Sequence, residues 1–181
     1  IGNNEEIFVI PDLAPRSISL GETPERAVKE VGSVDLIYVA RIVANKNLHF
    51  LLEVLNEVRG NVRLTIVGPH EDTQYWEQCQ ALMRKLPENV TINILGLLPH
   101  ESVLRELAKA HIFILPTQSE NFGYSIVEAL AMGCPIAISD RTPWNNLTGH
   151  DWAEILDLED RAEWIRVIDK FASMGRSGYS K

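Results

Sequence analysis

Short apolar runs rich in β-branched residues recur along the chain, and longer segments with a helical period separate them. The runs show little alternation of apolar and polar positions, which is typical of strands that are covered on both faces of a sheet. Strands are predicted at residues 7–10, 36–40, 63–67, 91–95, 112–115 and 135–139, with a weaker one at 153–156.

The segments between these strands place their apolar residues on one helical face. The predicted faces are Leu48, Leu51, Leu52, Leu55 and Val58; Tyr75, Cys79, Leu82, Met83 and Leu86; Val103, Leu104 and Leu107; the span 124–132; and Ala162, Ile165, Ile168 and Phe171. Gly60, Gly133 and Gly175 are expected to end the first, fourth and last of these helices. Asp157 is the expected N-cap of the last helix.

Strand and helix alternate at a spacing that predicts right-handed βαβ units. The predicted fold class is therefore α/β, with an open, Rossmann-like parallel sheet flanked by helices on both faces. The length of 181 residues predicts a single domain over 1–181, with a core at about residues 35–174 behind a leading segment, 1–34. Because the chain begins at Ile1 instead of Met, we expect it to be a piece of a longer protein.

Composition excludes several protein classes. With 45% apolar and 23% charged residues, the chain is neither disordered nor a coiled coil. No apolar run approaches about 18 residues and no signal-peptide pattern is visible, so no membrane span or secretory leader is predicted. The net charge of −8 argues against a nucleic-acid partner. The two cysteines, Cys79 and Cys134, lie in apolar patterns and are expected to be buried thiols of a reducing compartment.

No metal site is predicted, because the five histidines lack ligand spacing and the chain has neither a C-x-x-C nor a D-x-D motif. His111 opens an apolar strand, and we interpret it as a hydrogen-bonded histidine at the edge of the sheet, not as a base.

Ligands of an open parallel sheet bind beyond the carboxyl ends of its strands, so the loops that follow the strands are the candidate site. Arg41 and Lys46 follow the strand at 36–40. They form either a clamp for a diphosphate or two solvated loop charges, and position alone favours neither interpretation. Trp144, after the strand at 135–139, either lines the cleft or anchors its loop.

The loop after the strand at 112–115 contains Glu120, Phe122 and Gly123 and leads into a helix. Gly123 allows close approach of the backbone to a ligand, and the N-terminus of the helix, at Tyr124 and Ser125, favours an anion. Taken alone, the same pattern also fits an ordinary helix start with an exposed glutamate.

Several of these segments together resemble one family. They are Val39-Ala40-Arg41 with Lys46, Thr65-Ile66-Val67-Gly68-Pro69, Ile94-Leu95-Gly96 and the run 115–135, in which Glu120 and Glu128 form an E-x7-E pair. In this order they are similar to the C-terminal, donor-binding domain of GT-B-fold retaining glycosyltransferases, the large group 1 or family 4 type that includes sucrose synthase and bacterial mannosyltransferases.

The resemblance implies a role for each matching residue. Arg41 and Lys46 would hold the donor diphosphate, Glu120 would lie near the donor sugar, and Glu128 would accept hydrogen bonds from the ribose. The remaining matches are Leu98 at the nucleobase, and Phe122, Gly123, Tyr124 and Ser125, whose backbone would meet sugar and phosphate. Glu120 is expected to act in catalysis with Arg41 and Lys46, and to contribute little to binding of the free nucleotide.

Three single positions and one run of three residues depart from the family pattern. Ala40 and Asn47 stand where the family commonly has glycine around the two cations, and Asn121 replaces the usual glycine before Phe122. The sequence Thr142-Pro143-Trp144 stands where the family usually has small residues or glycine after the strand at 135–139.

The implied activity is metal-independent transfer of a hexose from a nucleoside-diphosphate sugar to an acceptor hydroxyl, in glycan biosynthesis. No cofactor is expected, since the nucleoside-diphosphate sugar is the donor substrate. The N-terminal acceptor domain of such an enzyme is missing here, so the chain is expected to be inactive alone. The resemblance implies a cytoplasmic protein and leaves open a peripheral membrane association of the intact protein through the missing half. Two rivals remain: a non-catalytic nucleotide- or sugar-binding module, and a glycosidase that uses Glu120 and Glu128 but leaves Arg41 and Lys46 unexplained.

Overall fold

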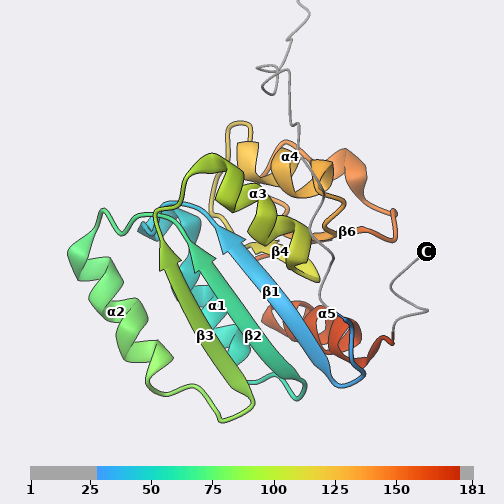
Figure 1. Ribbon diagram of the computed structural model, residues 1–181, viewed down its shortest axis with the longest axis horizontal. Helices are drawn as coiled ribbons and strands as arrows, with labels where there is room; N and C mark the ends of the chain where they lie inside the picture. The colour runs from blue at the N-terminus through green and yellow to red at the C-terminus, as the bar shows by residue number, and fades with distance from the viewer. Residues whose placement is uncertain (1–27, 176–181) are drawn as a thin grey trace, which may run out of the picture.

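The computed structural model describes residues 28–175, and in this range the strands form one parallel sheet of six (Figure 1). The strands are β1 (Ser33–Val39), β2 (Asn61–Val67), β3 (Val90–Gly96), β4 (Ile112–Leu115), β5 (Ile136–Ser139) and β6 (Ala153–Leu156). Their order, β3-β2-β1-β4-β5-β6, is the 3-2-1-4-5-6 order of the Rossmann fold. The predicted fold class is confirmed, and the strand predicted at 7–10 lies outside the described residues.

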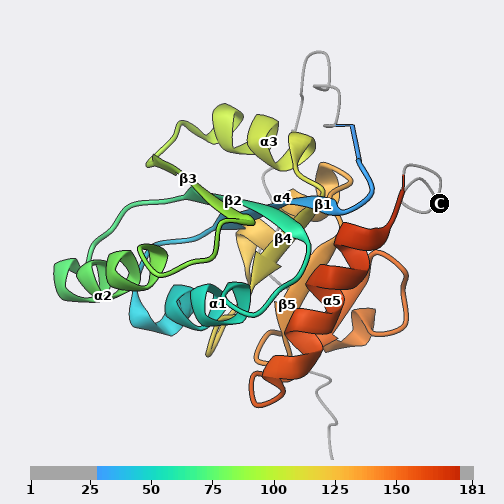
Figure 2. The same ribbon diagram turned by 90° about the horizontal axis from the view of Figure 1, so that it is seen from below.

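Helices cover both faces of this sheet, as predicted. They are α1 (Leu48–Leu55), α2 (Thr73–Met83), α3 (His100–Lys109), α4 (Tyr124–Ala131) and α5 (Arg161–Ser173), with short 3-10 turns η1 (Ala44–Lys46) and η2 (Asn145–Leu147). Figures 1 and 2 show α1, α2 and α5 on one face and α3 on the other. α4 packs beside α3, as right-handed crossovers on the two sides of β1 require.

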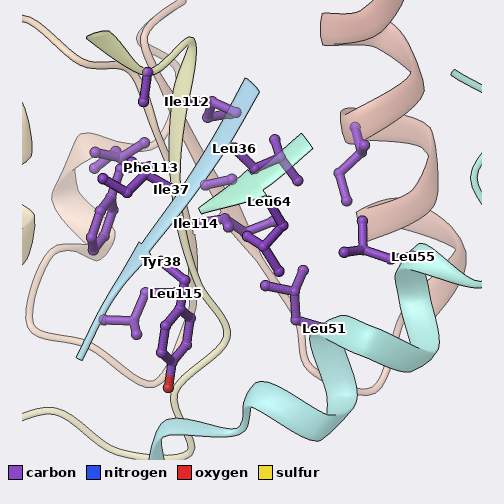
Figure 3. Close-up of a cluster of buried hydrophobic side chains, with 14 of the residues drawn as sticks. Leu36, Ile37, Tyr38, Leu51, Leu55, Leu64, Ile112, Phe113, Ile114 and Leu115 are labelled. Atoms are coloured by element: carbon purple, nitrogen blue, oxygen red, sulfur yellow. The ribbon is translucent and has the colours of Figure 1, made fainter. Parts of the chain in front are cut away.

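The buried core lies between the sheet and these helices. Figure 3 shows Leu51 and Leu55 of α1 directed at the strands, where they meet Leu36 and Leu64. All four residues of β4 and of β5 are buried. All are apolar except Ser139, whose hydroxyl donates to Thr117 O at 2.6 Å.

The outermost strand, β3, departs from the prediction that every strand is covered on both faces. Thr91 and Asn93 are exposed, and 47% of the surface of Ile94 is exposed to solvent. Arg63 of the interior strand β2 is exposed as well and pairs with Thr91, so this part of the sheet is open to solvent on one face. In addition, β3 has a neighbouring strand on one side only.

His111 is hydrogen-bonded as predicted, but it does not lie at an edge. Its Nδ1 accepts a hydrogen bond from the backbone N of Asp35 at 2.9 Å, and 2% of its side chain is exposed. It immediately precedes β4, which lies between β1 and β5. Cys79 and Cys134 are both buried, as predicted, and no disulfide joins them.

The predicted end of the first helix was wrong. α1 ends at Leu55, five residues before Gly60. Gly60 has a packing role instead: a Cβ on it would lie 2.5 Å from the Cβ of Ala172 on α5. Gly133, with a φ of 66°, does follow the end of α4 as predicted.

The start and face of the last helix also differ from prediction. The N-cap is Asp160, whose carboxylate accepts from the N–H of Glu163 at 3.0 Å. The predicted cap, Asp157, accepts from the N–H of Glu159 and so closes the turn ahead of the helix. Ala162 is exposed and Ile165 only half-buried. The buried face consists of Trp164, Val167, Ile168, Phe171 and Ala172.

The second helix is shorter than predicted, since it ends at Met83 and leaves Leu86 beyond it. Of its predicted face, Tyr75 and Cys79 are buried and Leu82 and Met83 are half-buried.

Candidate functional site

Loops from five strands meet at the carboxyl edge of the sheet, where ligands of this fold class bind. Backbone hydrogen bonds tie them together: Ile42 N donates to Pro69 O at 2.8 Å, and Gly68 N donates to Gly96 O at 2.8 Å. The loop after β1 is joined in the same way to the loop after β4, because Gln118 N donates to Asn45 O at 2.8 Å. The candidate residues therefore project from a connected rim.

Two backbone features fix the loop that carries Arg41 and Lys46. Gly68 has a φ of 139°, and a Cβ on it would lie 1.9 Å from Ala40 O, so only glycine lets the β1 and β2 loops approach this closely. Asn47 has a φ of 60° and is the one non-glycine residue with positive φ among residues 28–175. Asparagine tolerates this left-handed conformation better than most residues, which explains why it replaces the family's glycine.

Lys46 and Glu120 form an ion pair at the centre of the rim. Lys46 Nζ lies 2.5 Å from Glu120 Oε2, and 14% and 16% of the two side chains are exposed. The phenol of Tyr38 donates to Lys46 O at 3.2 Å. Burial raises the pKa of Tyr38 well above its usual value, so this phenol remains protonated and a donor. The sequence predicted both members of the ion pair as site residues.

Arg41 pairs with a different carboxylate. Its guanidinium is 62% exposed and contacts Glu71 Oε2 at 3.0 Å. Glu71 lies in the loop after β2, and sequence reasoning missed it, although an acid in a loop at the carboxyl edge was the available signal.

The loop between β4 and α4 is anchored on both sides. Glu120 N donates to Arg141 O at 3.1 Å, and Trp144 Nε1 donates to Phe122 O at 2.6 Å. The Phe122 ring lies 5.7 Å from the Trp144 ring and 4.9 Å from that of Tyr124, measured between centroids. Of the two interpretations of Trp144, the structure supports the loop anchor.

Gly123 is the N-cap of α4, with a φ of 83°. A Cβ there would lie 2.7 Å from Ile126 Cδ1 and 3.1 Å from Glu120 Cγ, so a larger residue would have to displace these side chains, and the positive φ favours glycine as well. Tyr124 and the half-buried Ser125 form the first turn, where backbone N–H groups point out of the helix. A helix end of this kind favours negative charge.

Glu128 lies one turn further along α4 and contacts another element. Its Oε1 lies 2.9 Å from Nε2 of His100, the first residue of α3, and 18% of its side chain is exposed. Leu98, two residues before His100, is half-buried against the core. The structure thus brings Glu128 and the candidate base-binding loop together through a histidine that sequence reasoning did not include.

Two further findings concern residues 28–175 only. No group of three or more His, Cys, Asp or Glu side chains is arranged to hold a metal ion. No helix in this range combines the length and apolar character that crossing a membrane demands.

The chain is similar to known sugar-transferring proteins. The GDP-Man:Man(3)GlcNAc(2)-PP-Dol alpha-1,2-mannosyltransferase of Caenorhabditis elegans is 29% identical over 133 residues, which are 68% of this chain and 28% of that protein. The lipopolysaccharide 1,6-galactosyltransferase of Escherichia coli (strain K12) is 30% identical over 118 residues, 63% of this chain and 32% of that protein. The matched residues span about a third of the length of these relatives.

Solved structures share the fold. HepE of Anabaena, solved in complex with UDP and glucose, superposes with a TM-score of 0.68 at 18% identity, over 82% of this chain and 44% of that one. Sucrose-phosphate synthase of Thermosynechococcus elongatus superposes with a TM-score of 0.66 at 19% identity, over 81% of this chain and 39% of that one. Residues 22–173 also match the family described as glycosyl transferases group 1. Since that match covers most of the sequence, the chain belongs to the glycosyl transferases group 1 family.

Proposed function

We propose that this chain is the donor-binding half of a retaining glycosyltransferase, which moves a sugar from a nucleoside diphosphate to an acceptor hydroxyl. The observation that carries the proposal is the largely buried ion pair between Lys46, in the loop after β1, and Glu120, in the loop that leads to the N-terminus of α4. A cation beside a helix N-terminus suits a diphosphate, and the adjacent carboxylate suits a sugar. UDP-glucose and UDP are ligands of the Anabaena neighbour, which supports a nucleotide-sugar donor.

The charged groups of the candidate site match the charges that develop on the donor when its glycosidic bond breaks. Breaking the bond between the sugar and the diphosphate leaves negative charge on the diphosphate and positive charge on the sugar ring. Arg41, Lys46 and the N-terminus of α4 stabilise the first, and Glu120 lies beside the second. Because these charges grow during cleavage, fixed groups favour the transition state over the ground state. Two cations and a helix end supply this stabilisation without a metal.

The remaining contacts follow the path of the donor. Leu98 lies at the nucleobase, Glu128 at the ribose, and the backbone of Tyr124 and Ser125 at the phosphates. Phe122 and Gly123 shape the loop against the sugar. Relatives named as mannosyl-, galactosyl- and glycogen-forming enzymes support a hexose as the transferred group.

The acceptor half is proposed to lie in a separate domain, consistent with relatives about three times as long as the aligned part. The chain alone is then expected to bind donor weakly and to turn over none.

Titration calorimetry of UDP, GDP and ADP in the presence of a chelator tests donor binding. At least one is expected to bind. A charge-assisted hydrogen bond contributes about 1.5–3 kcal/mol. Arg41 is exposed, so we place R41A at the low end of this range, as a loss of about tenfold in affinity. R166A is the matched control, because Arg166 is also 62% exposed and also contacts a glutamate, at 3.0 Å, but lies on α5.

Binding of none of the three nucleotides at millimolar concentrations would contradict the proposal. Equal losses of nucleotide affinity in R41A and R166A would mean that Arg41 acts only as a general surface charge and does not contact the diphosphate. Retention is tested on the intact protein by NMR of the anomeric proton of the product. Nucleotide binding without any transfer by the intact protein would favour the binding-module alternative.

A further inference from the structure

The carboxylate of Glu128 has a partner that the donor contacts described above do not use. His100 Nε2 lies 2.9 Å from Glu128 Oε1, within hydrogen-bond distance. The two residues belong to different helices, α3 and α4, which pack against each other on one face of the sheet. The contact therefore crosses a helix interface, and each side chain is carried by a separate rigid element.

The backbone of His100 is well fixed. Pro99, with a φ of −57°, is the N-cap of α3, and the helix is anchored in the core by Leu104 and Leu107. Glu128 lies one turn inside α4, whose Ile126 and Ala129 are buried. Since both backbones are held, the bond between the side chains sets the direction of the Glu128 carboxylate.

The imidazole restricts one oxygen and leaves the other available. A carboxylate has about four acceptor positions, and the His100 contact uses one of them, on Oε1. The Nε2–H donor is present both in the charged ring and in one neutral tautomer, so the bond does not require protonation of the ring. Only 18% of the Glu128 side chain is exposed, so water competes weakly for its orientation.

The position of Glu128 indicates which part of a nucleotide it meets. The loop with Leu98 precedes His100 on one side, and the N-terminus of α4 lies one turn before Glu128 on the other. If the nucleobase lies at the loop with Leu98 and the phosphates lie at the N-terminus of α4, the ribose between them lies at the Glu128 carboxylate. This step rests on the proposed function.

From these observations we infer that His100 is a positioning residue, which orients Glu128 toward the ribose hydroxyls and so sets the preference for ribose over deoxyribose. The His100 side chain is 52% exposed, as expected of a group at the mouth of the site. It acts through Glu128 and does not touch the reacting atoms.

The test compares UDP with 2′,3′-dideoxy-UDP, which lacks both ribose hydroxyls, by calorimetry on the full chain; GDP or ADP and its dideoxy form replaces this pair if it binds more tightly. The variants are H100A, H100Q, E128Q and the double variant H100A/E128Q. H150A is the control for loss of an exposed imidazole, because His150 lies before β6 and stacks on Trp152. Circular dichroism and thermal midpoints check that each variant folds.

We expect H100A to weaken UDP binding about tenfold, as for one lost orienting hydrogen bond, and to leave the dideoxy nucleotide unchanged. E128Q should remove the preference for ribose, and H100A should add nothing to it. H100Q, whose amide can still donate, should recover part of the affinity. H150A should match the wild type.

Equal weakening of both nucleotides by H100A would overturn the inference, since it would mean a direct contact of His100 with base or phosphate. Additive effects of H100A and E128Q, or no effect of H100A, would also overturn it. If the wild type binds a nucleoside diphosphate in a Lys46-dependent way, any of these outcomes removes this inference alone. If the wild type binds none, the proposed function fails and the role of His100 falls with it.

Discussion

A diphosphate that binds Lys46 has to compete with Glu120, because the Glu120 carboxylate is the anion that Lys46 holds at 2.5 Å. Replacing Glu120 with glutamine removes this competing charge and keeps the shape of the side chain. From the sequence alone, Glu120 is expected to contribute little to binding of free nucleotide. The ion pair changes that expectation, and E120Q is now predicted to bind free nucleoside diphosphate more tightly than the wild type.

The magnitude follows from the burial of the pair. A hydrogen bond between charged groups contributes about 1.5–3 kcal/mol net, and exposures of 14% and 16% leave little screening by solvent. If the glutamine amide retains about half of that interaction, about 1 kcal/mol of competition is lost, which corresponds to roughly fivefold tighter binding. Turnover by the intact enzyme should fall in the same variant, because the transition state loses its carboxylate.

Calorimetry of UDP, GDP and ADP with wild type and E120Q measures this effect. E71Q is the matched control, since it removes the partner of Arg41, whose pair is 62% and 49% exposed. Exposed pairs contribute about 0–1 kcal/mol. If the glutamine again retains about half of that interaction, E71Q should change affinity by roughly twofold at most. A folded E120Q that binds nucleotide with unchanged or weaker affinity would refute the reasoning, and would mean that Lys46 and Glu120 bind the diphosphate without competing.

Three further changes have defined outcomes. G68A should lower the free energy of unfolding by about 3 kcal/mol, because its Cβ would meet Ala40 O at 1.9 Å, whereas G149A, with positive φ but open space, should cost less; denaturant titration compares them. W144F keeps an aromatic ring but loses the hydrogen bond of 2.6 Å from the indole N–H to Phe122 O, so hydrogen exchange in the 120–123 loop should speed up with little change in thermal midpoint. Burial raises the pKa of Cys79 to about 11, so the unfolded thiol ionises first as pH rises; stability should be full below about pH 9 and fall toward pH 11, and less steeply in C79A. A pH profile shared by C79A and wild type would assign the loss to other groups.

Local sequence patterns were enough for the strands and most helices. The apolar runs predicted each strand in residues 28–175, because a parallel strand buried between helices has to be apolar along its length. Arg41, Lys46 and Glu120 could be expected at the carboxyl edge of the sheet because they follow strands that end there. Glu128 was proposed only from the family resemblance, and the roles of all four residues stay predictions.

Properties that depend on distant residues could not be predicted from such patterns. The exposure of Arg63 on β2 and of Thr91 and Asn93 on β3 depends on strand order and on which part of the sheet the helices cover, and periodicity encodes neither. Gly60 resembled a helix stop, but its missing side chain makes room for Ala172, more than a hundred residues away in sequence. The partners of the site charges, Glu71 and His100, lie on other loops and helices, so their contacts exist only in the folded chain.

The pairing of each site cation with a carboxylate of its own chain also affects how fast an anionic donor can arrive. Arg41 with Glu71 and Lys46 with Glu120 are nearly neutral when seen from a distance, and they belong to a chain of net charge −8. Long-range attraction, which raises association rates for oppositely charged partners, is therefore missing here. If the chain binds the proposed nucleotide sugar, that donor reaches the rim by diffusion without electrostatic steering, and we expect added salt not to slow its capture.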